Sequence, residues 1–398
     1  MKYLGVPRRV IRGAFLFYAL YPLVPLFGEA MAKDSLFSCF WVLFLMAYIE
    51  VVRARGRVLG SGRFCLFLGL VLVLLFLTKK TGVYIAVPAL IALLFAVRAH
   101  SSRLIACAAV SCLLFFGLWE SVLLPAWGVE KGEQAELLSV PSQQVSYLLR
   151  THGDGLRDQD IQVIESAYGS ARQLADGYNP LRADATKVLW RNDAPAGDKL
   201  RFALWYLEQG VRHPLTYLKA FLALDLPAYH SYFGSAEGYN GVTHPITSAL
   251  LLSPGASTVD IDLVSIHYDI DKGATTAMTS GYHRPTLLAR ASQAFDGLYE
   301  QVQQLFAPFF CKALFILWGP LLIVFYAWRT RRRVALWVMV PLGLMIASLL
   351  VGPILLTRYM IALVYALPLA VLVLFVRDGI DCGDAHESAR EPVAAGDA

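Results

Sequence analysis

Residues that could do chemistry lie in short polar stretches between long apolar runs of this sequence. The first stretch, residues 28–35, reads GEAMAKDS and carries Glu29, Lys33 and Asp34 just before an apolar run. An acid at the N-terminus of a helix is stabilised by the helix dipole, so one interpretation of Asp34 is a helix cap. The functional interpretation is that Asp34, with Glu29 near it, is a catalytic carboxylate at the membrane face, where it positions an acceptor or binds a metal.

Positive side chains occur in two further turns. Lys79 and Lys80 end an apolar run within the stretch LTKKTG, and Arg358 stands just before the last apolar run. Ammonium and guanidinium groups at a membrane face can bind the phosphate of a lipid substrate. The alternative for all three residues is anchoring, in which the charged end of a long side chain reaches the lipid head groups.

Two Asp-x-Asp pairs, Asp260/Asp262 and Asp269/Asp271, lie in a stretch that partly alternates apolar and polar residues. Carboxylates at positions i and i+2 share one face of a strand and can bind a divalent cation. A divalent cation is therefore the candidate cofactor. The alternative is a solvated strand face. The spacing of the cysteines and histidines predicts neither a metal site nor a nucleophile.

The elements that must position these residues are strongly apolar. The 398 residues are 57% hydrophobic and 16% charged, with a mean hydropathy of +0.53, whereas soluble domains carry about 25% charged residues. Apolar runs predict about eight transmembrane helices, of which the third and fourth are shorter than the usual span of about 20 residues and are expected to be tilted or to form a re-entrant pair. They fall near residues 10–27, 35–52, 64–77, 83–97, 104–124, 309–328, 334–357 and 359–376.

We therefore predict an all-α polytopic membrane protein with one large, mainly α extracytoplasmic domain. The expected parts are an N-terminal bundle of about five spans, the extracytoplasmic domain, a C-terminal bundle of about three spans and a disordered cytoplasmic tail. They occupy residues 1–124, 125–308, 309–376 and 377–398.

Apolar periodicity in the extracytoplasmic segment predicts three helices. They cover residues 157–173, 197–224 and 285–306, with a break at His213-Pro214 in the second, and residues 259–271 are a candidate strand.

The distribution of charge predicts the topology. Residues 125–308 carry 14 Lys/Arg and 20 Asp/Glu, a net charge of −6, and the rest of the chain has a net charge of +11. Four basic stretches, residues 1–13, 53–63, 98–103 and 329–333, fall on one side if the spans alternate, and the positive-inside rule makes that side the cytoplasm. Both termini are then cytoplasmic and the long segment is extracytoplasmic. The basic excess thus reflects topology, and nucleic acid is not an expected partner.

No predicted span has a charged residue near its middle. Intramembrane charges usually mark an ion or proton path. Their absence argues against an ion-coupled transporter and favours a scaffold that holds a site at the outer surface.

Two motifs in this order resemble the GT-C superfamily of membrane glycosyltransferases that use polyprenyl-phosphate sugars. The superfamily includes protein O-mannosyltransferases and the aminoarabinose transferases of lipid A. The first motif is Lys33-Asp34-Ser35-Leu36-Phe37 after two prolines, and the second is the stretch LTKKTG at 77–82. Arg358-Tyr359 before the last span also resembles bacterial members. The resemblance covers residues 10–97 best and the last spans loosely.

This resemblance implies transfer of a sugar from a polyprenyl-phosphate carrier to an envelope glycan, lipid or protein at the outer face of a bacterial plasma membrane. Membrane lipid and the carrier-linked sugar are the implied partners. Asp34 and Glu29 would serve the acceptor, and Lys79, Lys80 and Arg358 would bind the lipid phosphate.

The chain departs from the superfamily pattern at its start. GT-C enzymes carry a catalytic acid in an outer loop after a first span, and this chain begins just before the Lys33-Asp34 hinge. The expectation is a member that lacks those spans. Such a chain is an N-terminally shortened product, is completed by a protein partner, or is inactive, unless Glu29 replaces the acid.

Two alternatives remain open. A polysaccharide polymerase or ligase would depend on His283 and Arg284 instead of Asp34. A non-catalytic membrane scaffold would bind another envelope protein through its outer domain.

Overall fold

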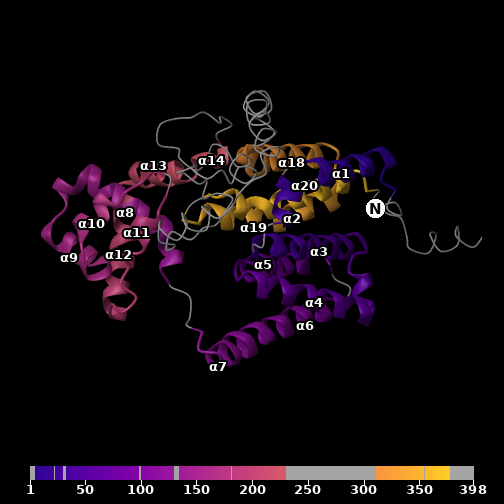
Figure 1. Cartoon of the computed structure of the whole chain (residues 1–398), viewed down its shortest axis with the longest axis horizontal. Coiled ribbons are helices and arrows are strands. Elements are labelled where there is room, and N and C mark those ends of the chain that lie inside the picture. The colour runs from indigo at the N-terminus through magenta and orange to yellow at the C-terminus, as the bar shows by residue number, and fades with distance from the viewer. Residues whose placement is uncertain are drawn as a thin grey trace, which may run out of the picture. The chain divides into compact units, whose positions relative to one another are not determined.

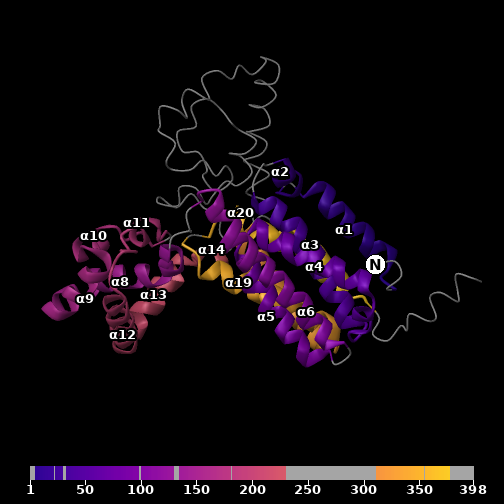
Figure 2. The ribbon, with the colours of Figure 1, turned by 90° about the horizontal axis from the view of Figure 1, so that it is seen from below.

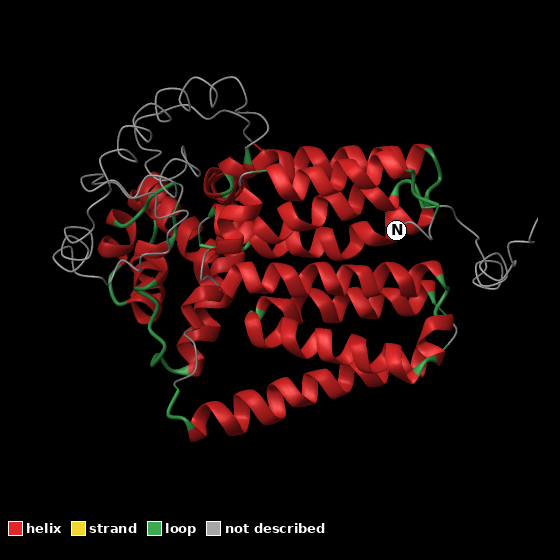
Figure 3. Cartoon of the chain, turned by 45° about the vertical axis from the view of Figure 1, so that its right-hand side comes forward, coloured by secondary structure: helices red, strands yellow, loops and turns green. Residues whose placement is uncertain are grey.

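The fold is that of a computed structural model, in which the described residues are 5–21, 23–29, 33–97, 100–129, 134–180, 182–229, 311–353 and 355–376. This part of the chain is built of helices, and its β-structure is limited to one isolated bridge, Asn179–Arg182 (Figure 3). The predicted all-α class is therefore confirmed for the described residues. The chain divides into two compact units, each of which is described by itself.

The first unit lies within Met1–Leu123, Gly319–Met345 and Ile361–Ala398. Its helices α3 to α6 run side by side (Figures 1 and 2). The N-terminal helices of this unit are α1 (Arg8–Leu20), α2 (Leu23–Glu29), α3 (Lys33–Arg53), η2 (Arg57–Gly60), α4 (Gly62–Thr78), α5 (Thr81–Ala96), α6 (Ser101–Cys112) and the π-helical segment η3 (Leu113–Leu123).

The first predicted span, residues 10–27, is interrupted in the structure. Tyr21 has an extended backbone (φ −72°, ψ 114°), which ends α1. The residue before a proline avoids the helical conformation, because the ring of Pro22 would clash with it. Neither α1, with 13 residues, nor α2, with 7 residues, is long enough to cross a bilayer by itself.

α3 is the most deeply buried long helix of the first unit. Its rings Phe37, Trp41 and Phe44 are almost completely buried, with centroids 6.4 and 5.6 Å apart along the helix. In contrast, the helix Ser101–Ala126 has the same mean hydropathy, but only 11% of its most apolar stretch is buried, against 61% for α3. An exposed apolar surface of this extent is typical of a helix that contacts lipid or another apolar surface.

Three described helices, instead of about eight, are long and apolar enough to cross a membrane: Lys33–Arg53, Ser101–Ala126 and Arg333–Leu350. They indicate a membrane location. The 21 residues of α3 reach about 31 Å at 1.5 Å per residue, close to the hydrocarbon thickness of about 30 Å. α4 and α5 have only 17 and 16 residues, because the charged turn at Lys79-Lys80 separates them.

The C-terminal helices are α18 (Gly319–Arg329), α19 (Arg333–Leu350) and α20 (Thr357–Val373). The boundary between the two units passes through α19 and α20. Within the first unit, the Tyr18 hydroxyl donates to the Tyr365 carbonyl oxygen at 2.5 Å, and the Tyr365 hydroxyl donates to the Val24 carbonyl oxygen at 2.9 Å. These bonds join α1 and α2 to α20, from opposite ends of the chain.

The second unit lies within Leu124–Trp318 and Ile346–Met360. The predicted helix at 157–173 is split, because Gly169 takes a positive φ of 81° that ends the first half. The predicted helix at 197–224 breaks at His213 and restarts with Pro214, which confirms that prediction.

The described helices of the second unit are α7 (Leu124–Ala126), η4 (Gln134–Leu138), α8 (Ser139–His152), η5 (Gly153–Gly155), α9 (Asp158–Tyr168), α10 (Ala171–Asp176), α11 (Asp184–Lys187), α12 (Ala196–Arg212), α13 (Pro214–Leu224), α14 (Leu226–Tyr229) and the π-helical η6 (Leu314–Trp318).

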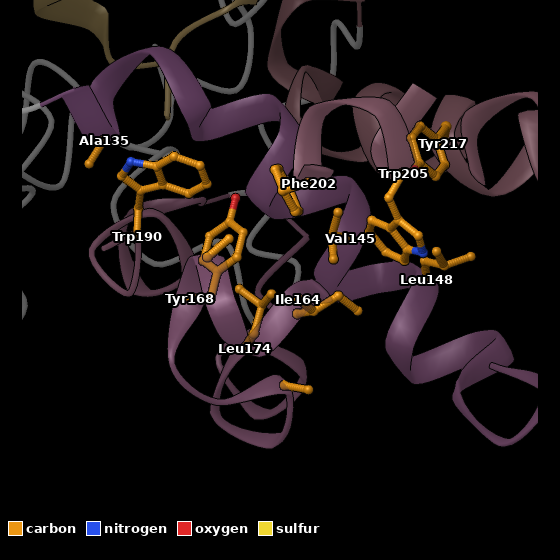
Figure 4. Close-up of a cluster of buried hydrophobic side chains, with 12 residues drawn as sticks. Ala135, Val145, Leu148, Ile164, Tyr168, Leu174, Trp190, Phe202, Trp205 and Tyr217 are labelled. Carbon is orange, nitrogen blue, oxygen red and sulfur yellow. The ribbon is translucent and has the colours of Figure 1, made fainter. Parts of the chain in front are cut away.

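An aromatic cluster forms the core of the second unit (Figure 4). The ring of Phe202 lies 5.3 Å from that of Tyr168 and 5.5 Å from that of Trp190, both edge to face. One buried polar pair lies inside this core: the Trp205 indole nitrogen donates to the Asp160 carboxylate at 2.9 Å, and the Asp160 carboxylate also accepts from Arg157. The Arg157 hydrogen bond holds the pKa of Asp160 below its usual range.

Several expectations lie outside the described residues. These are the candidate strand at 259–271, the helix predicted at 285–306 and the tail 377–398.

Candidate functional site

Asp34 lies in the first turn of α3, where the sequence placed it, and its side chain is only 5% exposed. The hydroxyl of Ser38, one turn further on, donates to the Asp34 carbonyl oxygen at 2.7 Å. The N-terminal turn of a helix favours a negative charge, but a carboxylate this buried also needs a partner. The structure supplies one from a different helix.

That partner is Lys79, which directly follows the last residue of α4. Its Nζ lies 2.6 Å from Oδ1 of Asp34, and its side chain is 17% exposed. The same ammonium group lies 5.7 Å from the ring centroid of Phe37, which is a cation–π distance. Asp34 and Lys79 therefore form a buried ion pair between α3 and the α4–α5 turn.

The α4–α5 turn is held in a tight conformation by Gly82. The backbone N–H groups of Gly82 and Val83 donate to the carbonyl oxygens of Lys79 and Lys80 at 2.8 and 3.0 Å. A Cβ atom on Gly82 would lie 3.0 Å from both the Cγ and the carbonyl oxygen of Leu75. Only glycine leaves α5 this close to the last turn of α4, which explains the glycine of the LTKKTG stretch by packing.

We expect Gly82→Ala to lower the free energy of unfolding by about 1–3 kcal/mol, since the added methyl group meets backbone that cannot move aside. Thermal unfolding in detergent would measure this. The matched control is Gly69→Ala in α4, where a Cβ meets nothing within 4 Å; it should be neutral or stabilising by up to about 1 kcal/mol. Equal effects of the two changes would contradict the packing role of Gly82.

Lys80 has a partner that the sequence analysis did not select. Its Nζ lies 2.7 Å from Oε1 of Glu120, and the two side chains are 52% and 26% exposed. Glu120 lies in the π-helical segment η3, a type of irregularity that is frequent at functional sites. The signal that could have found Glu120 is that it is the single acid near the C-terminal end of the apolar run at 104–124, at the end where alternating helices would place the lysines.

The four charged residues lie at one end of the N-terminal helices of the first unit. This lysine end consists of Asp34, Lys79, Lys80 and Glu120. At the other end of the same helices, Nη1 of Arg103 donates to the carbonyl oxygens of Leu59 and Gly60, at 2.9 and 2.5 Å. Arg103 at the start of α6 thus meets residues 59 and 60 at the end opposite the lysines.

Polar atoms without hydrogen-bond partners follow Asp34 along α3. The Ser35 hydroxyl, the Trp41 indole nitrogen and the Tyr48 hydroxyl are buried and have no hydrogen-bond partner among the described residues. Each such group carries a desolvation cost that a bound water or ligand would offset. Ser35 directly follows Asp34 in the first turn of α3.

The other predicted site residues belong to other elements or lie outside the described residues. Glu29 is the last residue of α2. Arg358 belongs to the second unit, where its Nη2 donates to the Tyr359 hydroxyl at 2.8 Å and its Cζ lies 4.7 Å from the Tyr359 ring centroid. The aspartates predicted as metal ligands, Asp260, Asp262, Asp269 and Asp271, lie outside the described residues. Within the described part of the chain, no group of three or more metal-ligating side chains is found.

The lysine end combines a carboxylate acceptor with two ammonium donors. A carboxylate can take a proton from a hydroxyl group, and ammonium groups can stabilise the charge of a phosphate. In this structure each ammonium group is already paired with a carboxylate.

Fold and site together define an all-α protein with long membrane-type helices and a buried ion pair at the end of its first unit. The chain belongs to a family of unknown function, DUF6020, which matches residues 4–392. Comparison with curated proteins and with solved structures gives no match. These comparisons therefore show no link to the GT-C superfamily.

Proposed function

We propose that the protein is an integral membrane glycosyltransferase that moves a sugar from a polyprenyl-phosphate carrier to an acceptor of the cell envelope. The observation that carries this proposal is the Asp34–Lys79 ion pair beside Lys80, because it joins a carboxylate to two cations at one helix end. The glycosyltransferase assignment rests on the resemblance of the hinge and the LTKKTG stretch to GT-C enzymes, and the ion pair supports it.

The proposed topology places the lysine end outside the cytoplasm. Arg103 meets residues 59 and 60 at the opposite end of the same helices. The basic stretches of the sequence at 53–63 and 98–103 include these residues, and the positive-inside rule assigns that end to the cytoplasm. Sugar transfer would then take place at the outer membrane face.

In the proposed reaction, the phosphate of the carrier competes with Asp34 for Lys79, while Lys80 adds a second cation. The released Asp34 carboxylate accepts the proton of the acceptor hydroxyl as its oxygen bonds to the anomeric carbon. The bond from that carbon to the phosphate oxygen breaks, and the carrier phosphate leaves with the bonding electron pair, stabilised by the ammonium groups. Glu29 and Arg358 remain candidates for accessory roles.

The test separates phosphate binding from transfer. Native mass spectrometry in nanodiscs would measure the binding of polyprenyl phosphate, with uncharged polyprenol as a reference. We expect Lys80→Met to weaken binding by about tenfold, the loss of one charge-assisted contact, and Lys219→Met, at an exposed lysine of α13, to leave it unchanged. Equal binding of phosphate and polyprenol would overturn the role of the lysines.

Asp34→Asn should keep the binding of polyprenyl phosphate and abolish the transfer of radiolabelled sugar from polyprenyl-phosphate sugars to membrane acceptors. The physical reason is that an amide keeps the shape of the side chain but cannot accept the proton. Full transfer activity of a folded Asp34→Asn protein would contradict the catalytic role of Asp34.

A non-catalytic scaffold is the second candidate function. The observation that favours it is that Lys79 and Lys80 are already neutralised by carboxylates, as expected for structural ion pairs. Absence of transfer by the native protein, together with a stoichiometric partner that co-purifies with it, would support this alternative.

A further inference from the structure

Helices α4 and α6 pack against each other (Figures 1 and 2), and each contributes one cysteine to the contact. The Cys107 thiol of α6 donates to the carbonyl oxygen of Cys65 in α4 at 3.6 Å, and the Cys65 thiol donates to the carbonyl oxygen of Leu59 at 3.3 Å. The two thiols also interact with each other as side-chain hydrogen-bond partners, so their sulfur atoms are neighbours. Thiols are weak hydrogen-bond donors, so these contacts leave both side chains free to rotate.

Contacts on both sides of the cysteine pair fix the register of the two helices. One turn after Cys107, the Ser111 hydroxyl donates to the carbonyl oxygen of Gly69 at 3.4 Å. One turn before it, Nη1 of Arg103 donates to the carbonyl oxygen of Gly60 at 2.5 Å. Short side chains reach a facing backbone only where two helices approach closely. A disulfide needs such an approach, because its two Cα atoms must lie within about 7 Å of each other.

Both cysteines can be reached by a small reagent. They are half-buried, and neither is in a disulfide. Cys65 lies in the first turn of α4, which begins at Gly62, and Cys107 lies in the second turn of α6, which begins at Ser101. At 1.5 Å per residue, each thiol is therefore within about 10 Å of its helix end along the axis. Cysteines that respond to oxidants are typically accessible and next to a second cysteine that resolves the first product.

We propose that Cys65 and Cys107 are a redox modification site, at which a reversible disulfide joins α4 to α6. The oxidant is a low-molecular-weight disulfide of the glutathione type. The thiolate of one cysteine attacks a sulfur of this disulfide and releases one thiol, and the second cysteine then attacks the mixed disulfide and releases the other. The protons of the two cysteine thiols pass to the two released thiols, so two cysteines are oxidised as one small disulfide is reduced.

A disulfide at this place links the two helices that bring Lys80 and Glu120 together. α4 leads into the Lys79-Lys80 turn, and α6 continues into η3, which carries Glu120. The proposed topology places the cysteine pair near the cytoplasmic end. Disulfides of cytoplasmic proteins are usually transient and redox-sensing, which favours a reversible link over a permanent one. The inference itself is independent of the proposed glycosyltransferase activity.

The test counts free thiols in the full-length protein in nanodiscs. The protein is equilibrated with mixtures of oxidised and reduced glutathione, quenched with acid, denatured and treated with N-ethylmaleimide. The chain has six cysteines, so the reduced protein takes six labels in its intact mass. In the oxidising mixture we expect the loss of two labels without a glutathione adduct, a peptide in which Cys65 is linked to Cys107, and recovery of all six labels on reduction.

Three variants identify the pair. Neither Cys65→Ser nor Cys107→Ser should form an intramolecular disulfide in the same mixture, and the two variants check each other. Cys112→Ser is the matched control, because it removes another half-buried thiol from the same helix. It should form the disulfide to the same extent as the native chain.

Three outcomes would overturn the proposal. The first is a native chain that keeps six labels, or gains only glutathione adducts, in the oxidising mixture. The second is an intramolecular disulfide that persists in Cys65→Ser or Cys107→Ser, or that is lost in Cys112→Ser. The third is oxidation that yields only disulfide-linked dimers of the chain.

Discussion

Replacing Lys79 with methionine should lower the free energy of unfolding of the first unit by about 3–5 kcal/mol. The change removes the partner 2.6 Å from the Asp34 carboxylate, whose side chain is only 5% exposed. A buried charge without a partner is costly, because the desolvation that the ion pair had offset is no longer compensated. Thermal unfolding in nanodiscs, followed by tryptophan fluorescence, would measure the loss.

The neighbouring residue provides a matched control. Lys80→Met removes the same chemical group from a pair whose lysine side chain is 52% exposed, so the expected cost is below about 1 kcal/mol. The double variant Asp34→Asn/Lys79→Met should recover most of the stability, because the orphaned charge is gone. An equal loss of unfolding free energy in Lys79→Met and Lys80→Met would contradict the burial of the Asp34–Lys79 pair.

Replacing Asp225 with asparagine should stabilise the second unit above neutral pH. Asp225 follows α13 and is 3% exposed, and its Oδ2 has no hydrogen-bond partner among the described residues. Burial disfavours the charged form and raises the pKa of Asp225 from 3.8 to about 7.

The sign of the pH dependence follows from this raised pKa. The stability associated with the protonated Asp225 is fully present below pH 3.8, the ordinary value, and is lost as the pH rises to about 7. Above that pH the native residue carries a penalty that asparagine avoids. The difference between the ordinary and the raised pKa of Asp225 corresponds to at most about 4 kcal/mol, at 1.36 kcal/mol per pKa unit. We therefore expect Asp225→Asn to stabilise the second unit by about 1–4 kcal/mol at pH 8.

Hydrogen exchange of α8 and α13 peptides, compared between variant and native protein at the same pH, would measure this effect. At pH 4 the two proteins should behave alike, since both side chains are neutral there. The control Asp176→Asn, at a side chain that is 74% exposed, should show no such dependence. Identical exchange of the Asp225→Asn and native proteins at pH 8 would contradict the buried, unpartnered carboxylate.

The amino-acid sequence by itself determined the all-α class and the positions of most helices. Long apolar runs form helices, because a backbone in an apolar environment must satisfy its hydrogen bonds locally. The restart of the chain at Pro214 was also predictable, since proline fits the first turn of a helix and breaks a longer one. Asp34 was also correctly expected at the start of α3, because the first turn of a helix favours an acidic residue.

The number of long helices could not be read from apolar runs alone. The run at 10–27 is long enough for a span, yet Tyr21 before Pro22 divides it into two short helices. The break at Lys79-Lys80, in contrast, was visible in the sequence, because the apolar runs at 64–77 and 83–97 already stopped on either side of the two lysines.

Only the tertiary structure decided which charges meet. Asp34 and Lys79 are separated by 45 positions, and Lys80 and Glu120 by 40. Alternating helices predict that these residues share one end of a bundle, but the pairing depends on which helix faces pack together and in what register. Burial of Asp34 and exposure of Lys80 follow from that packing. Adjacent lysines of the same chemistry therefore differ in their surroundings, and the sequence could not distinguish them.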